Sequence, residues 1–180
     1  MIIELAVCES PIGQMTAAVR DGQLCALTFS DHWAAGVKRL ERRFGDVEFR
    51  RVDDAAGTVR RLREYFAGTL DALDSIPVVF DGTAFQQRVW AELRKIPPGR
   101  TVSYGEVACR IGTPAAVRAV GAANGSNPIA IVIPCHRVIG GDGRLTGYGG
   151  GIDRKRWLLA HEGAQLALDS FIPTPAGACA

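Results

Sequence analysis

Apolar residues gather in three short runs at the start of the chain. These runs are 2–7, 14–20 and 23–29, and they are separated by turn sequences at 10–13 and 21–22. Runs of this length with such short connections predict an antiparallel meander containing one tight hairpin. The chain is therefore expected to open with a small three-stranded sheet.

The apolar pattern changes to helical spacing after residue 31. Residues 32–44 and 55–66 place apolar side chains three and four positions apart, as expected for helices with one buried face. Together with the strands they predict an α+β domain over residues 1–79, ending in a loop-like connector around Pro77. No catalytic constellation is visible in this domain, so we expect it to have a supporting role.

The second half of the chain is predicted to be helical. Thr83 marks the start of a helix over 84–96, and a Ser-x-x-Glu capping box starts another at 103–111. Thr113, followed by proline, starts a helix that continues to about residue 124. The last two helices, joined by a tight turn, predict a helix-turn-helix.

A closing helix is expected over 153–162, with Gly163 ending it. The fold class is thus α+β, with a small N-terminal antiparallel sheet and helices followed by a helical, winged-helix-like domain. This second domain is predicted to span 80–163, and residues 164–180 are expected to form a tail that frays.

The candidate for chemistry is Cys135, which follows the apolar run 129–133. This run is expected to be a buried strand that delivers the cysteine. A cysteine in such a place is more often a small core residue than a nucleophile. His136 and Arg137 change this balance, because a base and a cation beside a thiol favour the thiolate.

Composition and charge limit the classes of protein to consider. The 180 residues are 47% hydrophobic and carry a net charge of +2, which suits a globular protein. The N-terminus lacks the features of a signal peptide and no apolar run would span a membrane, so we expect a cytoplasmic protein. Residues 81–163 hold 11 basic and 6 acidic side chains, an asymmetry that suits a polyanionic partner; a solvated, mildly basic face is the alternative.

Neither the cysteines nor the histidines suggest a metal site. Five scattered cysteines do not form a disulfide framework and suit a reducing compartment. Cys8, Cys25 and His32 are too loosely spaced for a closed zinc site. We predict no metal.

The second helix of the helix-turn-helix has an unusual surface. Val117 and Val120 are expected to face the core. The opposite stripe comprises Ala115, Arg118, Ala119 and Ala122. A solvated stripe normally carries Lys and Glu, whereas small side chains with one arginine would let the helix enter a narrow groove. An alanine-rich helix with an incidental arginine is the alternative.

The sequence Pro134-Cys135-His136-Arg137-Val138, preceded by Asn-Pro and an apolar run, resembles the signature of the O6-alkylguanine-DNA alkyltransferases. The resemblance covers about residues 80–163 and extends more loosely to the N-terminal part. It implies direct-reversal DNA repair, in which the alkyl group of O6-alkylguanine moves irreversibly to Cys135, once per chain. The implied partner is alkylated double-stranded DNA, bound through its minor groove with the damaged nucleotide flipped out.

The resemblance also implies roles for individual residues. His136, supported by Glu162, takes the thiol proton through a water, and Asn127 orients the site. Tyr104 crowds the 3′ phosphate of the flipped nucleotide and gives its hydroxyl to the base, while Arg118 fills the gap left in the helix. The implied catalytic residues are Cys135, His136, Glu162, Asn127 and Tyr104; those for DNA are Arg118, Tyr104, Ala115, Ala119 and Ala122; those for substrate are Tyr104, Val138, Tyr148 and Gly149.

Gly149 departs from the family pattern, because many relatives have serine there. Only its backbone amide contact to O6 is carried over, and the preference for bulky alkyl groups is left open. We expect no cofactor, no obligatory protein partner and a monomer. Two other functions stay in consideration: a DNA-binding regulator that does no chemistry, and a thiol hydrolase using Cys135 and His136.

Overall fold

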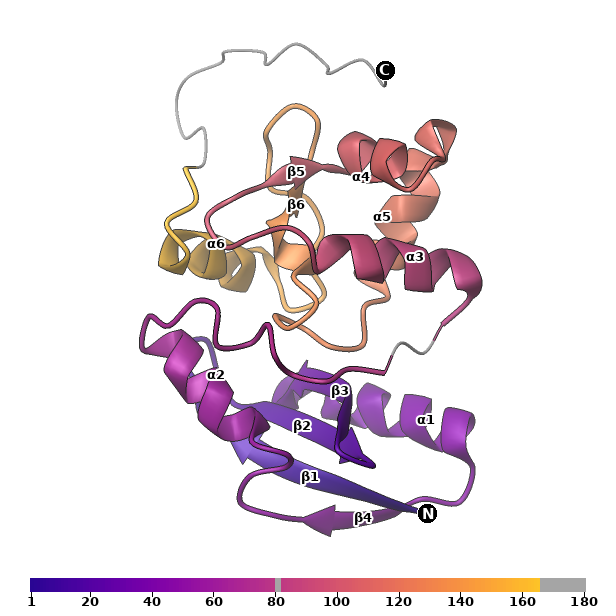
Figure 1. The fold of residues 1–180 in the computed structure, drawn as a ribbon, viewed down its shortest axis with the longest axis vertical. Coiled ribbons are helices and arrows are strands. Elements are labelled where there is room, and N and C mark those ends of the chain that lie inside the picture. The colour runs from indigo at the N-terminus through magenta and orange to yellow at the C-terminus, as the bar shows by residue number, and fades with distance from the viewer. Residues whose placement is uncertain (80–81, 166–180) are drawn as a thin grey trace. The chain divides into compact units, whose positions relative to one another are not determined.

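The computed structural model describes residues 1–79 and 82–165, which divide into two compact units (Figure 1). The first unit comprises the described residues up to 79 together with Pro128–Val132. The second comprises residues 82–127 and 133–165. The expected tail beyond residue 165 lies outside the described residues. None of the helices in the described ranges combines the length and apolar character that a membrane crossing needs.

The predicted meander is confirmed. It consists of β1 (Ile2–Cys8), β2 (Met15–Arg20) and β3 (Gln23–Phe29), with antiparallel pairing between neighbours. The hairpin between β2 and β3 turns at Asp21 and Gly22, which have φ values of 49° and 74°. Positive φ at both central residues gives the twist that tight hairpins favour.

The sheet is mixed rather than antiparallel, because it contains a fourth strand that pairs in parallel. The sequence did not predict this strand. β4 (Glu48–Arg51) pairs in parallel with β1, giving the order β3-β2-β1-β4. Phe49 is its only apolar residue, and the other three side chains are exposed. An edge strand with so little buried surface has almost no hydrophobic pattern to detect.

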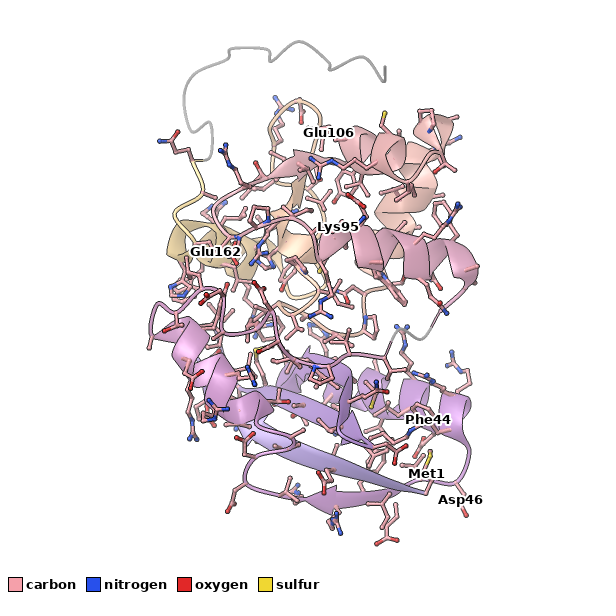
Figure 2. The ribbon with its side chains drawn as sticks, in the orientation of Figure 1. Met1, Phe44, Asp46, Lys95, Glu106 and Glu162 are labelled. Atoms are coloured by element: carbon pink, nitrogen blue, oxygen red, sulfur yellow. The ribbon has the colours of Figure 1, made fainter. Side chains whose placement is uncertain are left out.

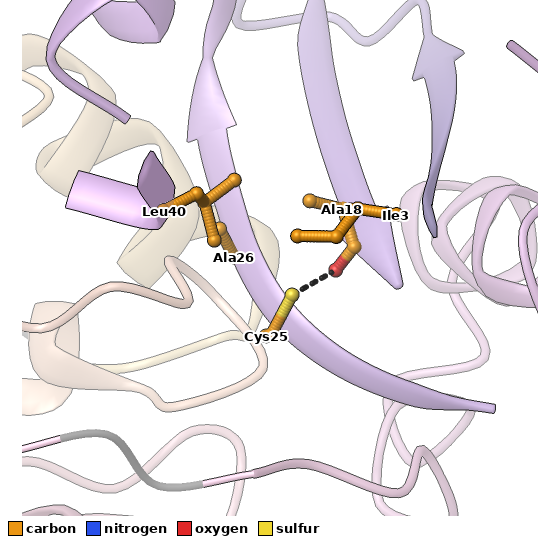
Figure 3. Packing of buried hydrophobic residues seen from close by; sticks show 5 residues of the cluster. All are labelled: Ile3, Ala18, Cys25, Ala26 and Leu40. Carbon is orange, nitrogen blue, oxygen red and sulfur yellow. Dashed lines mark hydrogen bonds between the residues drawn. The ribbon is translucent and has the colours of Figure 1, made fainter. Parts of the chain in front are cut away.

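Two helices pack on this sheet. α1 (Trp33–Phe44) contacts β3, and α2 (Thr58–Phe66) contacts β1. The buried cluster beside α1 contains Ile3, Ala18, Cys25, Ala26 and Leu40 (Figure 3). Within it, the Cys25 thiol donates a hydrogen bond to the Ala18 carbonyl at 3.2 Å, and burial raises the pKa of Cys25 to about 11. Cys25 therefore behaves as a core residue rather than a nucleophile.

The helices predicted for the second unit are confirmed, with shifted ends. They are α3 (Ala84–Leu93), α4 (Tyr104–Arg110), α5 (Val117–Gly125) and α6 (Ile152–His161). Thr83 and Ser103 cap α3 and α4 in reciprocal capping boxes with Gln86 and Glu106, the latter labelled in Figure 2. α3, α4 and α5 pack against one another. Capping boxes satisfy the free amides of the first helical turn, and their residue pattern is local, so the starts of α3 and α4 could be predicted from the sequence.

A short parallel pair of strands was not predicted. β5 (Val102–Ser103) pairs with β6 (Val138–Ile139). β5 leads directly into α4, and β6 directly follows the Cys-His-Arg sequence. The pairing therefore brings Tyr104, the first residue of α4, close to the candidate site.

The prediction of a strand over residues 129–133 is wrong. Only isolated bridging occurs there: Leu27 of β3 donates its N–H to the Pro128 carbonyl at 3.0 Å and accepts from the Ala130 N–H at 2.9 Å. Ile131 then adopts a left-handed conformation with φ of 68°, which interrupts extended structure. A β-branched residue in this region is a rare outlier, so no residue pattern indicated the turn.

Candidate active site around Cys135

Cys135 starts a short 3-10 turn, η3 (Cys135–Arg137), directly after Pro134. Only 6% of the Cys135 surface is exposed to solvent. The Asn127 side-chain amide donates to the Cys135 Sγ at 3.0 Å and to the Ile133 carbonyl at 2.8 Å. One amide thus fixes both the sulfur and the main chain that leads to it.

His136 and Arg137 share a single carboxylate, that of Glu162, which directly follows α6 (Figure 2). Glu162 Oε1 lies 2.9 Å from His136 Nε2. Arg137 donates to both carboxylate oxygens, through Nη2 at 2.8 Å and Nε at 2.9 Å, and its Nη1 donates to the Ile96 carbonyl. The His136 and Glu162 side chains are fully buried. Arg137 and Glu162 therefore form a buried ion pair, and His136 is hydrogen-bonded to its carboxylate.

The ionisation of Glu162 follows from these contacts. Burial disfavours its charge, but the hydrogen bonds and charges of His136 and Arg137 outweigh burial and hold its pKa well below the usual value of 4.5. A charged carboxylate can only accept, so His136 Nε2 must carry the hydrogen that it donates. The other ring nitrogen, Nδ1, is buried and has no hydrogen-bond partner among the described residues. The neutral ring is left with an unprotonated Nδ1 that can take a proton.

His136 is expected to stay neutral at pH 6.5, with its hydrogen on Nε2. Burial lowers its pKa below 6.5, the Arg137 and Lys155 charges add to this effect, and Glu162 opposes it. Nitrogen-15 NMR of the imidazole across pH 5 to 8 measures both the charge and the tautomer. A midpoint at or above 6.5, or a hydrogen on Nδ1, would contradict this assignment.

Cys135 rests as a thiol. Burial raises its pKa above 9.0, and the hydrogen bond from Asn127 and the charge of Lys155 partly oppose that rise. The site therefore needs a base to form the thiolate, and a cation and an amide are already in place to stabilise it.

Lys155 was missed by the sequence analysis. It is fully buried on α6, and its Nζ donates to the carbonyls of Val138 at 2.6 Å and Thr146 at 2.7 Å. Burial lowers its pKa from 10.5 to about 8, while the charge of Cys135 opposes this shift. One sequence signal existed: Lys155 occupies a core position on the buried side of a helix, where a lysine is rare unless it is paired.

The loop after β6 carries the other expected substrate residues and is held at Thr146. The Thr146 hydroxyl donates to the Tyr104 hydroxyl at 3.4 Å, and the same residue's carbonyl accepts from Lys155. The Tyr148 hydroxyl is buried and has no hydrogen-bond partner within residues 1–79 and 82–165. Burial raises its pKa, and a negative charge on Cys135 would raise it further. Val138 is buried and Gly149 is exposed.

The helix-turn-helix is present as α4, a 3-10 turn η2 (Pro114–Ala116) and α5. Three details of its prediction are wrong. Thr113 makes no side-chain cap, and a 3-10 turn rather than an α-helix follows it. Val120 is buried as expected, but Val117 is 40% exposed. The tighter 3-10 turn rotates the helix start, so spacing counted from an α-helix placed Val117 on the wrong face.

The stripe along η2 and α5 has the exposure that its pattern predicts. Its members Ala115, Arg118, Ala119 and Ala122 are all exposed. This surface therefore offers one guanidinium among small side chains. Gly121 of α5 lies against the Tyr104 ring: a Cβ atom added to Gly121 would be 3.9 Å from the nearest ring carbon of Tyr104.

Comparisons with known proteins identify the family of the chain. The model of the 6-O-methylguanine DNA methyltransferase DNA-binding domain matches residues 84–164. A methylated-DNA–protein-cysteine methyltransferase of Mycolicibacterium paratuberculosis is 50% identical over 93% of this chain and 99% of its own length. The chain belongs to this methyltransferase family. The family's Shigella flexneri member is 48% identical over 80% of this chain and 85% of its own.

The structural comparison supports the same membership. The crystal structure of Mycobacterium tuberculosis OGT in complex with DNA superposes with a TM-score of 0.76 at 44% identity, over 89% of this chain and 92% of that chain. The match spans both units, so the family resemblance is not confined to the methyltransferase signature. Among the described residues, no three His, Cys, Asp or Glu side chains are grouped closely enough to hold a metal ion.

Proposed function

We propose that this chain repairs O6-alkylguanine in DNA by moving the alkyl group irreversibly to its own Cys135. The observation that carries the proposal is the Cys135 Sγ held by Asn127, with the next residue in the chain a histidine whose unprotonated ring nitrogen can accept a proton. Membership in the methyltransferase family supplies the reaction type. A thioether has no feasible leaving group, so each chain would act once.

The proposed transfer exchanges one proton for one alkyl group. His136 Nδ1 takes the thiol proton through a water, and Glu162 stabilises the imidazolium that forms. The thiolate sulfur attacks the alkyl carbon, the bond from that carbon to O6 breaks, and its electron pair stays with the guanine. The guanine anion takes up one proton and the His136 imidazolium gives one up, so the sulfur, the imidazole and the guanine all end neutral. Lys155 and Asn127 stabilise the sulfur while it is negative.

For DNA, we propose that α5 enters the minor groove and that the damaged nucleotide is flipped out. The O6 substituent lies within the duplex, and a sulfur in a residue that is 6% exposed cannot reach it there. The exposed small residues of α5 allow close approach, and Arg118 would occupy the gap. Double-stranded DNA is the only partner that the mechanism requires, so we propose that the protein acts as a monomer.

For the flipped base, the proposed contacts come from Tyr104, Val138, Tyr148 and Gly149. Tyr148 supports this role because a buried hydroxyl without a partner is costly unless something else satisfies it. A Cβ added at Gly149 would meet nothing within 4 Å, and φ there is not in the left-handed region. The serine of many relatives would therefore fit at this position, and its absence removes a hydroxyl rather than relieving a clash.

Intact mass after incubation with duplex DNA containing O6-methylguanine tests the proposal. We expect one added methyl group, located on Cys135 by peptide mapping, and one lesion repaired per chain. Cys135→Ser is expected to gain no methyl group. More than one lesion repaired per chain would exclude the irreversible mechanism, and DNA binding without any adduct would favour a regulator.

A further inference from the structure

Asn124, near the end of α5, joins this helix to the backbone of the nucleophile. Its side-chain amide donates to the Cys135 carbonyl at 3.3 Å, and the residue is 3% exposed. Its Oδ1 is buried and has no hydrogen-bond partner in the described part of the chain. The Asn124 amide NH2 group therefore binds the reactive residue, while its carbonyl oxygen has no hydrogen bond in the described part of the chain.

Stability does not explain this asparagine. The Cys135 carbonyl already accepts the Val138 N–H within η3, so it does not need Asn124 to be satisfied. A buried acceptor without a partner costs free energy, and a leucine of similar size would avoid that cost. Polar residues that disfavour the folded state concentrate where a site needs a defined geometry.

We propose that Asn124 is a positioning residue that holds the Cys135 main chain in the orientation required for alkyl transfer. The proposal rests on the proposed function. Asn127 donates to the Ile133 carbonyl, before the Cys135 Cα, and to the Sγ, and Asn124 donates to the Cys135 carbonyl after it. The two amides hold the nucleophile on both sides of its Cα, so the direction of its Cα–Cβ bond is set by the end of α5 and the residues that directly follow it.

The test compares Asn124→Leu with the unchanged protein in single-turnover transfer. We expect transfer to slow roughly tenfold or more from both duplex O6-methylguanine and free O6-benzylguanine, because reaction rates are sensitive to small displacements of a nucleophile. The melting temperature should be unchanged or higher, since the unsatisfied oxygen is gone. Affinity for duplex DNA should not change. Asn124→Ala provides a second variant, in which transfer should also be slower than in the unchanged protein.

Two controls separate positioning from other effects. Ser126→Ala removes a hydrogen-bonded side chain from the same end of α5, where it contacts Gln86 and the Ala123 carbonyl, and should leave transfer unchanged. Asn127→Leu removes the donor to the sulfur and should move the pH profile of transfer upward. Asn124→Leu should lower the rate at every pH without moving the profile, because Asn124 touches the carbonyl and not the sulfur.

Three results would overturn the positioning role. They are an unchanged rate in both Asn124 variants, a rate that falls only together with the melting temperature, and a displaced pH profile like that of Asn127→Leu. If the unchanged protein does not take up an alkyl group at all, the proposed function fails instead. The two failures are therefore distinguishable in the same experiment.

Discussion

Replacing Glu162 by Gln should both slow alkyl transfer and destabilise the fold. Without the carboxylate charge, His136 loses the group that favours its protonated form, so it becomes a weaker base for the thiol. We expect the single-turnover rate to fall by about 10²-fold, at the lower end of the range for losing general base catalysis. At the same time Arg137 keeps its buried charge and loses its partner. Breaking a buried ion pair in this way costs about 3–5 kcal/mol of stability.

The stability loss should depend on pH in a defined direction. The folded-state pKa of Glu162 lies well below 4.5, so the unfolded chain takes up the proton first as the pH falls. The contribution of Glu162 is therefore fully present above about pH 4.5 and is lost below it. Urea unfolding of both proteins from pH 3 to 7 should show their difference shrinking in acid.

A second variant separates the two effects. Combining Glu162→Leu with Arg137→Met removes both charges and should restore much of the stability, because apolar replacements of a buried pair are often neutral. Transfer should stay slow, since His136 still lacks its acceptor. Recovery of the rate together with stability would show that Glu162 acts only on folding.

Glu92 offers a matched control for Glu162→Gln. It lies in the same unit, is 8% exposed, and pairs with Lys95 at 2.7 Å and Arg110 at 3.9 Å. These ion pairs are separate from the carboxylate that holds His136 and Arg137. Glu92→Gln should cost less stability, because the Lys95 and Arg110 side chains are largely exposed, and it should leave the transfer rate unchanged.

Elements with a strong local signal could be predicted from the sequence. The capping boxes at Thr83 and Ser103 and the glycine stop at Gly163, with φ of 72°, placed three helix boundaries to within a few residues. The meander was readable because its turn residues require special backbone angles, as at Gly22. Each of these signals acts within a few positions along the chain, which is why a single sequence carries it.

Features that depend on distant partners could not be predicted. Arg137 was considered only as a cation beside the thiol, whereas in the structure it binds Glu162, 25 positions away. Lys155 is defined by two carbonyls that only the folded loop brings together. The left-handed Ile131 has no sequence signature, because its side chain normally disfavours that conformation. The link between His136 and Glu162 was expected only from the family resemblance, since spacing alone does not bring them together.

Replacing Arg118 by Ala should slow repair of duplex DNA much more than reaction with free O6-benzylguanine. If Arg118 fills the gap left by the flipped guanine, its loss makes extrusion less favourable, and extrusion costs a few kcal/mol of stacking and pairing. Free base needs no flipping, so its reaction should keep nearly the original rate. Single-turnover kinetics at saturating protein measure both reactions without the contribution of binding.

Arg110→Ala provides the control for general attraction to phosphates. Arg110 is an exposed arginine on α4, the other helix of the helix-turn-helix, and its side chain is 42% exposed. A simple phosphate contact would weaken duplex binding and reduce its salt dependence by roughly one unit of slope, with little effect on the bound step. Arg118→Ala should instead leave saturating binding largely intact and slow the step that follows it. If duplex and free-base reactions fall by the same factor, Arg118 acts on the structure around Cys135, and α5 has no role in nucleotide flipping.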